Sequence, residues 1–305
     1  VDLMILTHFD DDHLIGIKTF VENHRDDVPF PIKKMWANCA KHVSFDLSEN
    51  LSSNKASKMA DILCTISQKS QLDWEAYRLN GFVDDTITFA DIEVVNPRKD
   101  IFERFIANYK EKYDCGSSEE NLSNTKNMKS SINVDMHELA KRDKILGNPD
   151  KPSELINMVS LSVMIRCDVF SILALGDCFP KEIYLSLIER GYSKENKLQV
   201  DFIKMSHHGS AENISNELLD IIDCDNFIIT TDGGKGYKHP HREALANVLC
   251  HPERDYNRTV HFYFNYPLKT IVDNREEDLF NSELDKCLNF ECHEPKETDR
   301  FLILP

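Results

Sequence analysis

Residues 1–13 read VDLMILTHFDDDH, an apolar run that ends in a cluster of histidines and aspartates. Residues 1–7 predict a buried strand, because they form a short and almost wholly apolar segment. Leu14, Ile17 and Val21 then recur at helical spacing, which predicts a helix directly after the cluster. The polar residues therefore lie at a strand-to-helix turn, where a rigid backbone can hold several side chains close together.

The residue types of this turn are those of a metal site. His8, Asp10 and Asp12 alternate along its extended part and project to a common side, and His13 follows at the helix start. Two imidazoles and two or three carboxylates could hold two divalent cations. The alternative is an ordinary acidic helix N-terminus, since aspartate is favoured there by capping and by the helix dipole. The metal interpretation is a hypothesis that the other motifs must support.

Three further motifs each follow a predicted strand: Leu175-Gly176-Asp177, His207-His208-Gly209-Ser210 and His239-Pro240-His241. Each also has an ordinary interpretation, as a common turn, a polar loop that caps a helix, or a surface loop that opens one. Six of the twelve histidines, however, fall in the first motif and the last two. Sites in α/β proteins are built at the carboxyl ends of strands, so the combination favours one shared site.

The arrangement of predicted elements favours a layered α/β fold, because strands and helices alternate after residue 160. The predicted strands are 160–167, 169–175, 201–205, 227–231 and 259–264, and the helices between them are 181–190, 215–222 and 242–250. Upstream we predict a helix over 53–72 and strands over 86–89 and 92–95. We interpret the chain as a single domain over 1–305, with a polar insertion at 99–155 that carries short helices at 101–109 and 136–145. An acidic extension follows at 274–305.

Composition restricts the function. The chain has 305 residues, 52 acidic and 36 basic side chains, and a formal net charge of −16. This charge argues against a protein that coats nucleic acid, which needs a basic face, so a polyanionic substrate must be met locally or through bound cations. Neither a signal peptide nor an apolar run of about 20 residues is present. The nine cysteines include no CxxC pair. We therefore predict a cytoplasmic protein with reduced thiols and no membrane partner.

The motif order THFDDDH, LALGDC, KMSHHGS and YKHPHREAL resembles the metallo-β-lactamase superfamily. More narrowly, it is similar to the hydrolase domain of the competence DNA-uptake protein ComEC and its stand-alone relatives, which carry HxDxDH in place of HxHxDH. The resemblance covers about residues 1–110 and 155–265. It implies a four-layer αββα sandwich, here without its usual N-terminal strands and with a long insertion. We expect an upstream segment or a protein partner to complete the first sheet.

The resemblance also implies two divalent cations, Zn²⁺ or Mn²⁺ with Mg²⁺ as a further option. Carried over by position, His8 and Asp10 would bind one cation, and Asp12 and His13 the other. Asp177 would bridge both cations.

For the later motifs, the resemblance implies that His207 is a metal ligand with His208 beside it. His239 and His241 would lie near the substrate as ligand, phosphate contact or proton donor, and they form the candidate catalytic set with Asp12. Classical members have a histidine before the strand that leads to the GD motif, whereas this chain has the stretch 157–162, NMVSLS. The first metal site is therefore expected to be poorer in nitrogen.

The function implied is a metal-dependent hydrolase, a phosphodiesterase or nuclease that uses a metal-bridging hydroxide on DNA or RNA. By analogy alone, such a protein would suit a bacterial defence effector against phage. Two alternatives stay open. The same centre could hydrolyse a lactone, another small ester, a thioester, a cyclic nucleotide or a peptide, because a carboxylate-lined groove repels a long polyanion. The insertion and the acidic tail could instead mark a regulatory or assembly module with subsidiary catalysis.

Overall fold

The computed structural model describes residues 1–8, 10–27, 29–38, 73–75, 78–114, 131–142, 154–234, 236–296 and 304. The chain forms two compact units. The first comprises residues 1–83, 93–121 and 148–162, and the second comprises 84–92, 122–147 and 163–305. The described part is mixed α/β, with eight α-helices and a seven-stranded mixed sheet. The predicted α/β class is thereby confirmed.

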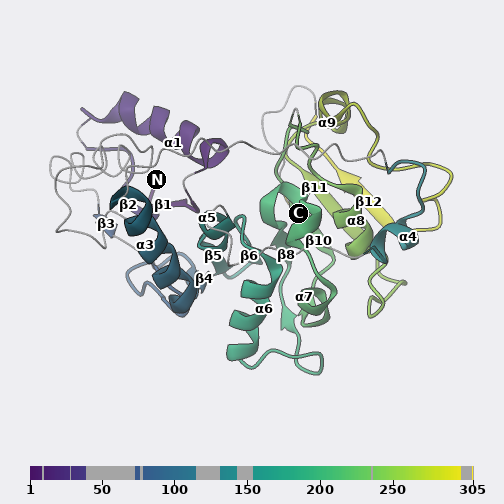
Figure 1. The fold of residues 1–305 in the computed structure, drawn as a ribbon, viewed down its shortest axis with the longest axis horizontal. Coiled ribbons are helices and arrows are strands. Elements are labelled where there is room, and N and C mark those ends of the chain that lie inside the picture. Colours follow the sequence, from purple (N-terminus) through teal and green to yellow (C-terminus); the bar gives the residue numbers. More distant parts are fainter. Residues whose placement is uncertain are drawn as a thin grey trace. The chain divides into compact units, whose positions relative to one another are not determined.

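The first unit contains a small parallel sheet in the order β1 (Leu3–Leu6), β2 (Lys34–Ala37) and β3 (Asp73–Glu75). Helix α1 (Asp11–His24) follows β1 and packs against it (Figure 1). The apolar face of the helix joins the strands in one core made of Leu6, Leu14, Val21, Phe30, Ile32, Met35 and Ala37, with Ile17 and Phe20 packed against it. The predicted strand and helix on either side of the first motif are both present.

The other elements of this unit are β4 (Asp91–Asn96), α3 (Lys99–Asp114) and α5 (Leu155–Met158). Helix α3 contacts α5. The buried Asn96 donates from Nδ2 to the carbonyl oxygens of Met158, at 2.8 Å, and Ser160, at 2.9 Å. These bonds fix the end of α5 and the residues just after it, within the NMVSLS stretch at 157–162.

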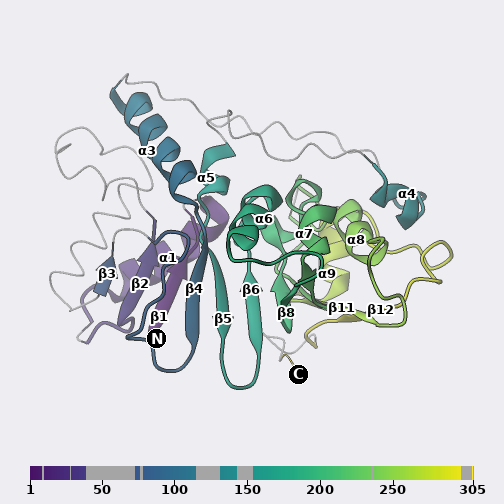
Figure 2. The same cartoon turned by 90° about the horizontal axis from the view of Figure 1, so that it is seen from below.

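The second unit is built on the large sheet. Its strands are β5 (Ser162–Arg166), β6 (Ser171–Ala174), β8 (Phe202–Lys204), β10 (Asn226–Ile229), β11 (Val260–Phe264) and β12 (Phe290–His293). Their order is β12-β11-β10-β8-β6-β5, and β4, whose first two residues belong to this unit, is the seventh strand. Strands β5 and β6 form an antiparallel hairpin, while β6, β8, β10, β11 and β12 are parallel to one another (Figure 2). The carboxyl ends of these parallel strands therefore meet at one edge of the sheet.

The helices of the second unit are α4 (Met136–Ala140), α6 (Pro180–Glu189), α7 (Asn216–Asp220), α8 (Arg242–Leu249) and α9 (Leu268–Arg275), and a two-stranded sheet pairs β7 (Leu198–Gln199) with β9 (Ile222–Asp223). Helix α8 is almost wholly buried and packs against α4, and α6 packs against α7. The alternation predicted after residue 160 is confirmed.

A buried cation fastens the C-terminal tail to α8. Arg242 is fully buried, and its Nη1 donates to the carbonyl of Leu279 at 2.7 Å and pairs with Asp285 Oδ2 at 3.2 Å. Its Nη2 donates to the carbonyl of Val134 at 3.0 Å. The segment expected as an acidic extension therefore contributes buried contacts to the second unit.

Two expectations about local structure need correction. The strand predicted over 86–89 is wrong, because Asp84 Oδ1 accepts hydrogen bonds from the amide of Thr86, at 3.1 Å, and from its hydroxyl. Such local bonds favour a turn over an extended strand. Helix α9 and strand β12 were not predicted. The helix expected over 53–72 and the residues 115–130 and 143–153 of the expected insertion lie outside the described residues.

No helix in the described ranges combines the length and the apolar character that a membrane span requires. The free cysteines of the described part are Cys167, Cys178, Cys224, Cys250, Cys287 and Cys292.

Candidate metal centre

The first motif lies between the end of β1 and the start of α1. Asp10 is the residue that precedes the helix, in an extended conformation (φ −72°, ψ 153°), and its carbonyl accepts from the amides of His13, at 3.1 Å, and Leu14, at 2.8 Å. Its side chain makes no capping hydrogen bond. The Asp10 carboxylate is therefore not used to cap the helix, which weakens the ordinary interpretation of this motif.

Hydroxyl groups orient the two imidazoles of the motif. Thr7 Oγ1 lies 3.1 Å from His8 Nδ1 and 3.2 Å from His13 Nδ1, and the ring centroids are 4.2 Å apart. The buried Ser160 also places Oγ 3.2 Å from His8 Nδ1. Ser160 lies in the stretch 157–162, and its hydroxyl helps to hold the ring of His8 in place.

The other nitrogen of each ring faces a carboxylate. His8 Nε2 lies 3.6 Å from Asp10 Oδ2, and His13 Nε2 lies 3.8 Å from Asp12 Oδ2. His8 is buried, His13 and Asp10 are half-buried, and Asp12 is exposed. Each pair therefore offers one nitrogen and one oxygen donor.

In the second unit, Asp177 and His207 come together at the carboxyl edge of the sheet. Asp177 follows β6, His207 follows β8, and the amide of His207 donates to the carbonyl of Gly176 at 3.0 Å. His207 Nε2 lies 3.8 Å from Oδ2 of the buried Asp177. Because β6 and β8 are parallel neighbours, their carboxyl ends bring the GD and HHGS motifs side by side.

Asn213, which no sequence motif marks, fixes the orientation of His207. Its Nδ2 donates to the carbonyls of Asp177, at 3.1 Å, and Cys178, at 3.2 Å, so its Oδ1 faces His207 Nδ1 at 3.2 Å. An amide oxygen can only accept, so His207 carries its proton on Nδ1 and keeps the lone pair on Nε2, toward Asp177. This is the arrangement in which an outer hydrogen bond prepares an imidazole to bind a metal.

We therefore expect Asn213→Ala to weaken binding of Zn²⁺ by about 10- to 100-fold, since loss of an orienting partner has effects of this size. Competition with a chromophoric chelator measures the affinity. Asn196→Ala, which removes an exposed asparagine bonded to the carbonyl of Gly191, is the matched control. Equal zinc affinities in the two variants would contradict the orienting role.

The HHGS loop has an unusual backbone. His207 (φ 47°, ψ 49°) and His208 (φ 56°, ψ 21°) both adopt left-handed conformations, which cost free energy for residues other than glycine. His208 Nδ1 donates to the carbonyl of Thr230, just beyond β10. The loop is thus held in a conformation that presents both imidazoles beside the end of β10.

The HPH segment is locked against this loop. Gly209 has φ +85°, and a Cβ atom there would lie 2.7 Å from Pro240 Cβ. The amide of His241 donates to the carbonyl of Gly209 at 2.9 Å, and the amide of Ala211 donates to His241 Nδ1 at 3.0 Å. His241 Nε2 in turn donates to the carbonyl of Tyr237 at 2.9 Å. Both ring nitrogens of His241 therefore bond main-chain groups, so this side chain joins the two loops.

His239, unlike His241, has a ring nitrogen that no described main-chain group bonds. Its side chain is buried, with its ring centroid 5.1 Å from that of His207 and 6.3 Å from that of His208. Within the described residues, its Nδ1 is buried without a hydrogen-bond partner. Burial, together with the neighbouring imidazoles, lowers the pKa of His239 to about 2. The unsatisfied nitrogen of this buried neutral imidazole can accept or donate a hydrogen bond to a ligand or a water molecule.

The lowered pKa of His239 predicts a pH effect on stability in the metal-free protein. When pH falls from 6.5 toward 2, the His239 side chain becomes protonated in the unfolded state but stays neutral in the folded state. The free energy of unfolding therefore decreases over this range. We expect this histidine to lower the free energy of unfolding by about 1 kcal/mol at pH 5.5 relative to pH 7.5. Urea titrations of chelated protein at both pH values should show the decrease, and His239→Gln should remove that part of it. His24→Asn, at an exposed histidine, should leave the decrease unchanged; an equal decrease in wild type and His239→Gln would contradict the prediction.

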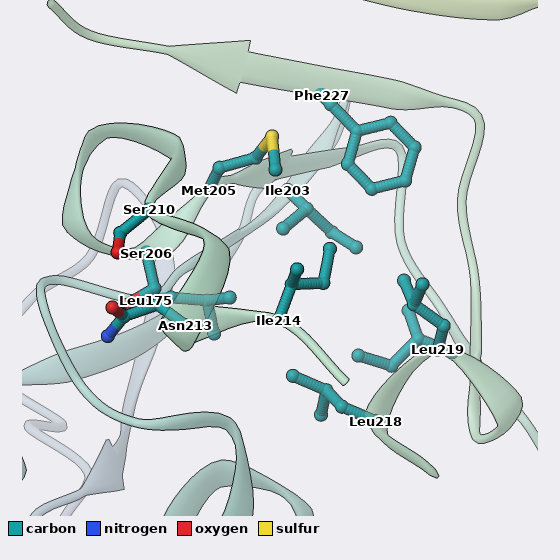
Figure 3. A pocket seen from close by; sticks show the side chains of 11 residues that line it. Leu175, Ile203, Met205, Ser206, Ser210, Asn213, Ile214, Leu218, Leu219 and Phe227 are labelled. Carbon is teal, nitrogen blue, oxygen red and sulfur yellow. Dashed lines mark hydrogen bonds between the residues drawn. The ribbon is translucent and has the colours of Figure 1, made fainter. Parts of the chain in front are cut away.

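A small cavity of about 20 Å³ lies under the HHGS loop. Figure 3 shows Ser206, Ser210 and Asn213 at one end of it, and Ile203, Phe227, Leu218 and Leu219 among its apolar walls. This volume has room for about one water molecule. The cavity therefore reflects the packing beside the loop, and none of the candidate metal ligands or histidines lines it.

The sequence-predicted residues thus fall into two sets. The second unit brings together Asp177, His207, His208 and His239, with His241 engaged in joining the loops; the first brings together His8, Asp10, Asp12 and His13. Groups of His, Asp and Glu side chains in the structure lie close enough to hold a metal ion. The sequence missed the supporting residues Thr7 and Asn213, and only the position of Ser160 drew attention beforehand.

No family model matches the chain, and no curated protein sequence matches it.

Proposed function

We propose that the chain is a metal-dependent hydrolase of the metallo-β-lactamase superfamily, in its ComEC-like branch, and that it cleaves phosphodiester bonds in nucleic acid. The proposal depends mainly on the environment of His239. This side chain is buried and neutral beside the Asp177–His207 pair, and its Nδ1 has no hydrogen-bond partner among the described residues. The motif order supports the superfamily and its αββα sandwich.

The donor set fits a divalent cation. A buried carboxylate and a neutral imidazole with its lone pair on Nε2 are ligands that zinc and manganese accept. Asp177 and His207 would hold a cation in the second unit. The pairs His8 with Asp10 and His13 with Asp12 offer the same donor types in the first unit.

In the proposed hydrolysis, the protein orients the side chains that would bind metal and donates one hydrogen bond to the substrate. A divalent cation, when bound, polarises a phosphoryl oxygen and lowers the pKa of water. Asn213 keeps His207 in the tautomer that binds metal. His239 stays uncharged at neutral pH, so it acts as a neutral N–H donor to a phosphoryl oxygen, and the surrounding protein strengthens this hydrogen bond by excluding water. His241 holds the loop that carries His239.

The charge of the chain determines how a nucleic acid would be held. A net charge of −16 argues against an extended basic surface that binds the phosphate backbone. The protein would therefore bind only the few nucleotides that lie next to the cations. We therefore expect cleavage of short single strands and small phosphodiesters at rates that change little with chain length.

The test is a substrate panel with one preparation of the full chain, loaded with Zn²⁺ or Mn²⁺ and compared with chelated protein. The panel holds single- and double-stranded DNA, RNA, bis-p-nitrophenyl phosphate, a cyclic nucleotide, a lactone and a thioester. Metal-dependent cleavage of DNA or RNA supports the proposal. Cleavage of the lactone or thioester alone refutes it.

A second candidate function keeps the cations but changes the substrate to a small ester, lactone or cyclic nucleotide. The acidic composition favours it, because carboxylates repel a long polyanion more than a small substrate. The two candidates differ in the same panel: the second predicts turnover of the small substrates and none of DNA or RNA.

A further inference from the structure

The last two strands of the large sheet carry a group of polar side chains on one face. In the β11–β12 register, His261 lies opposite Glu291, and Tyr263 lies opposite His293. Alternate residues of a strand point to the same face, so all four side chains share one face of the sheet. His261 also stands in register with Asn226, the first residue of β10. The group therefore runs from the second residue of β11 to the last residue of β12, and none of its side chains belongs to the proposed hydrolase centre.

The three metal-binding side chains of this group converge. His261 Nδ1 lies 3.0 Å from His293 Nε2 and 3.5 Å from Glu291 Oε2, and His293 Nε2 lies 3.9 Å from the same oxygen. A point equidistant from three atoms with these separations lies about 2 Å from each of them. That radius equals the zinc–nitrogen and zinc–oxygen bond lengths in proteins.

The surroundings hold the group in this geometry. The ring of Tyr263 stacks on that of His293, with centroids 4.5 Å apart and planes inclined by 14°. The amide of His261 donates to the carbonyl of Asp225 at 2.8 Å. The His261 and His293 side chains are 28% and 35% exposed and Glu291 is 62% exposed, so water can occupy a fourth coordination position.

We propose that His261, Glu291 and His293 form a zinc site, separate from the hydrolase centre, that fastens the edge strand β12 to β11. Two neutral imidazoles and a carboxylate with one open position are a donor set typical of zinc. On zinc binding, the proton shared between His261 Nδ1 and His293 Nε2 moves to the opposite nitrogen of its ring or to solvent. Among the described strands, β12 has a single neighbour in the sheet, so a cation that joins it to β11 opposes its detachment.

Hydrogen–deuterium exchange of the full chain, with and without Zn²⁺, tests the site. Zinc is expected to slow amide exchange in β11 and β12 by at least about 10-fold in wild type, and His261→Asn and Glu291→Gln should abolish this slowing. Glu283→Gln, at an exposed carboxylate of the same C-terminal segment, is the matched control and should slow like wild type. Asp177→Asn should also keep the slowing, which separates this site from the hydrolase centre.

Two results would overturn the proposal. The first is zinc that leaves β12 exchange unchanged in wild type. The second is equal slowing in wild type, His261→Asn and Glu291→Gln. Crystals grown with Zn²⁺ give an independent readout, because an anomalous peak is expected between the three side chains, and a peak elsewhere alone counts against the site.

Discussion

Asp177→Asn is expected to reduce metal-dependent hydrolysis at least ~10³-fold, since ligand loss forfeits several kcal/mol of stabilisation and each 1.36 kcal/mol is tenfold in rate. The substitution exchanges an anionic oxygen for an amide of the same shape at a buried position 3.8 Å from His207 Nε2. The folded structure should change little, because the carbonyl of Asp177 that Asn213 binds is retained. Steady-state cleavage of bis-p-nitrophenyl phosphate measures the effect, with metal content determined in parallel.

The matched control for this experiment is Asp273→Asn, an exposed aspartate that pairs with Lys269. Its activity should stay close to that of wild type, because surface pairs contribute little. Circular dichroism and urea unfolding establish that both variants are folded. If Asp177→Asn kept more than a tenth of the wild-type rate, Asp177 would not be a metal ligand and the proposed centre would fail.

Arg242→Ala is expected to lower the free energy of unfolding by about 3–5 kcal/mol, because it leaves the buried Asp285 carboxylate without its cation. It also removes the donors to the carbonyls of Leu279 and Val134. Urea denaturation followed by circular dichroism measures the change. The substitution should weaken the folded state without changing how much surface unfolding exposes. The slope of unfolding free energy against urea concentration should therefore stay constant.

Arg142→Ala provides the matched control, since Arg142 is half-exposed and pairs with Glu243 at 3.2 Å. We expect it to cost less than about 1 kcal/mol. The double variant Arg242→Met with Asp285→Leu removes both charges and should recover most of the lost stability. A cost below 1 kcal/mol for Arg242→Ala would show that Asp285 is neutralised by other means.

The elements between residues 160 and 264 could be predicted from the sequence because their apolar periodicity is strong and their lengths are ordinary. The placement of Asp177 and His207 near strand ends could be predicted as well, since they lie in the loops that follow β6 and β8. Local hydrogen bonding defeated the prediction over 86–89, where Asp84 forms a turn with Thr86. The apolar periodicity of a sequence does not show that one side chain will bond a nearby backbone group in place of a strand partner.

Contacts between distant residues could not be predicted in the same way. Strand β12 is four residues long and mixes polar with apolar side chains, so it becomes a strand only through its pairing with β11. Asn213 orients His207 from six positions along the chain, and Arg242 reaches Asp285 across 43. No local pattern marks such partners, because their roles come from tertiary packing.

The contact between Gly209 and Pro240 limits how this chain can vary. A side chain at 209 would collide with Pro240 and would also be strained at a φ of +85°, so the two positions should covary among relatives. Grafting the HHGS loop onto another scaffold would require residues 237–241 to be transferred with it, because His241 bonds both segments. The two motifs lie 30 residues apart in the chain, but they depend on each other structurally. They therefore have to be conserved together in evolution and transferred together in design.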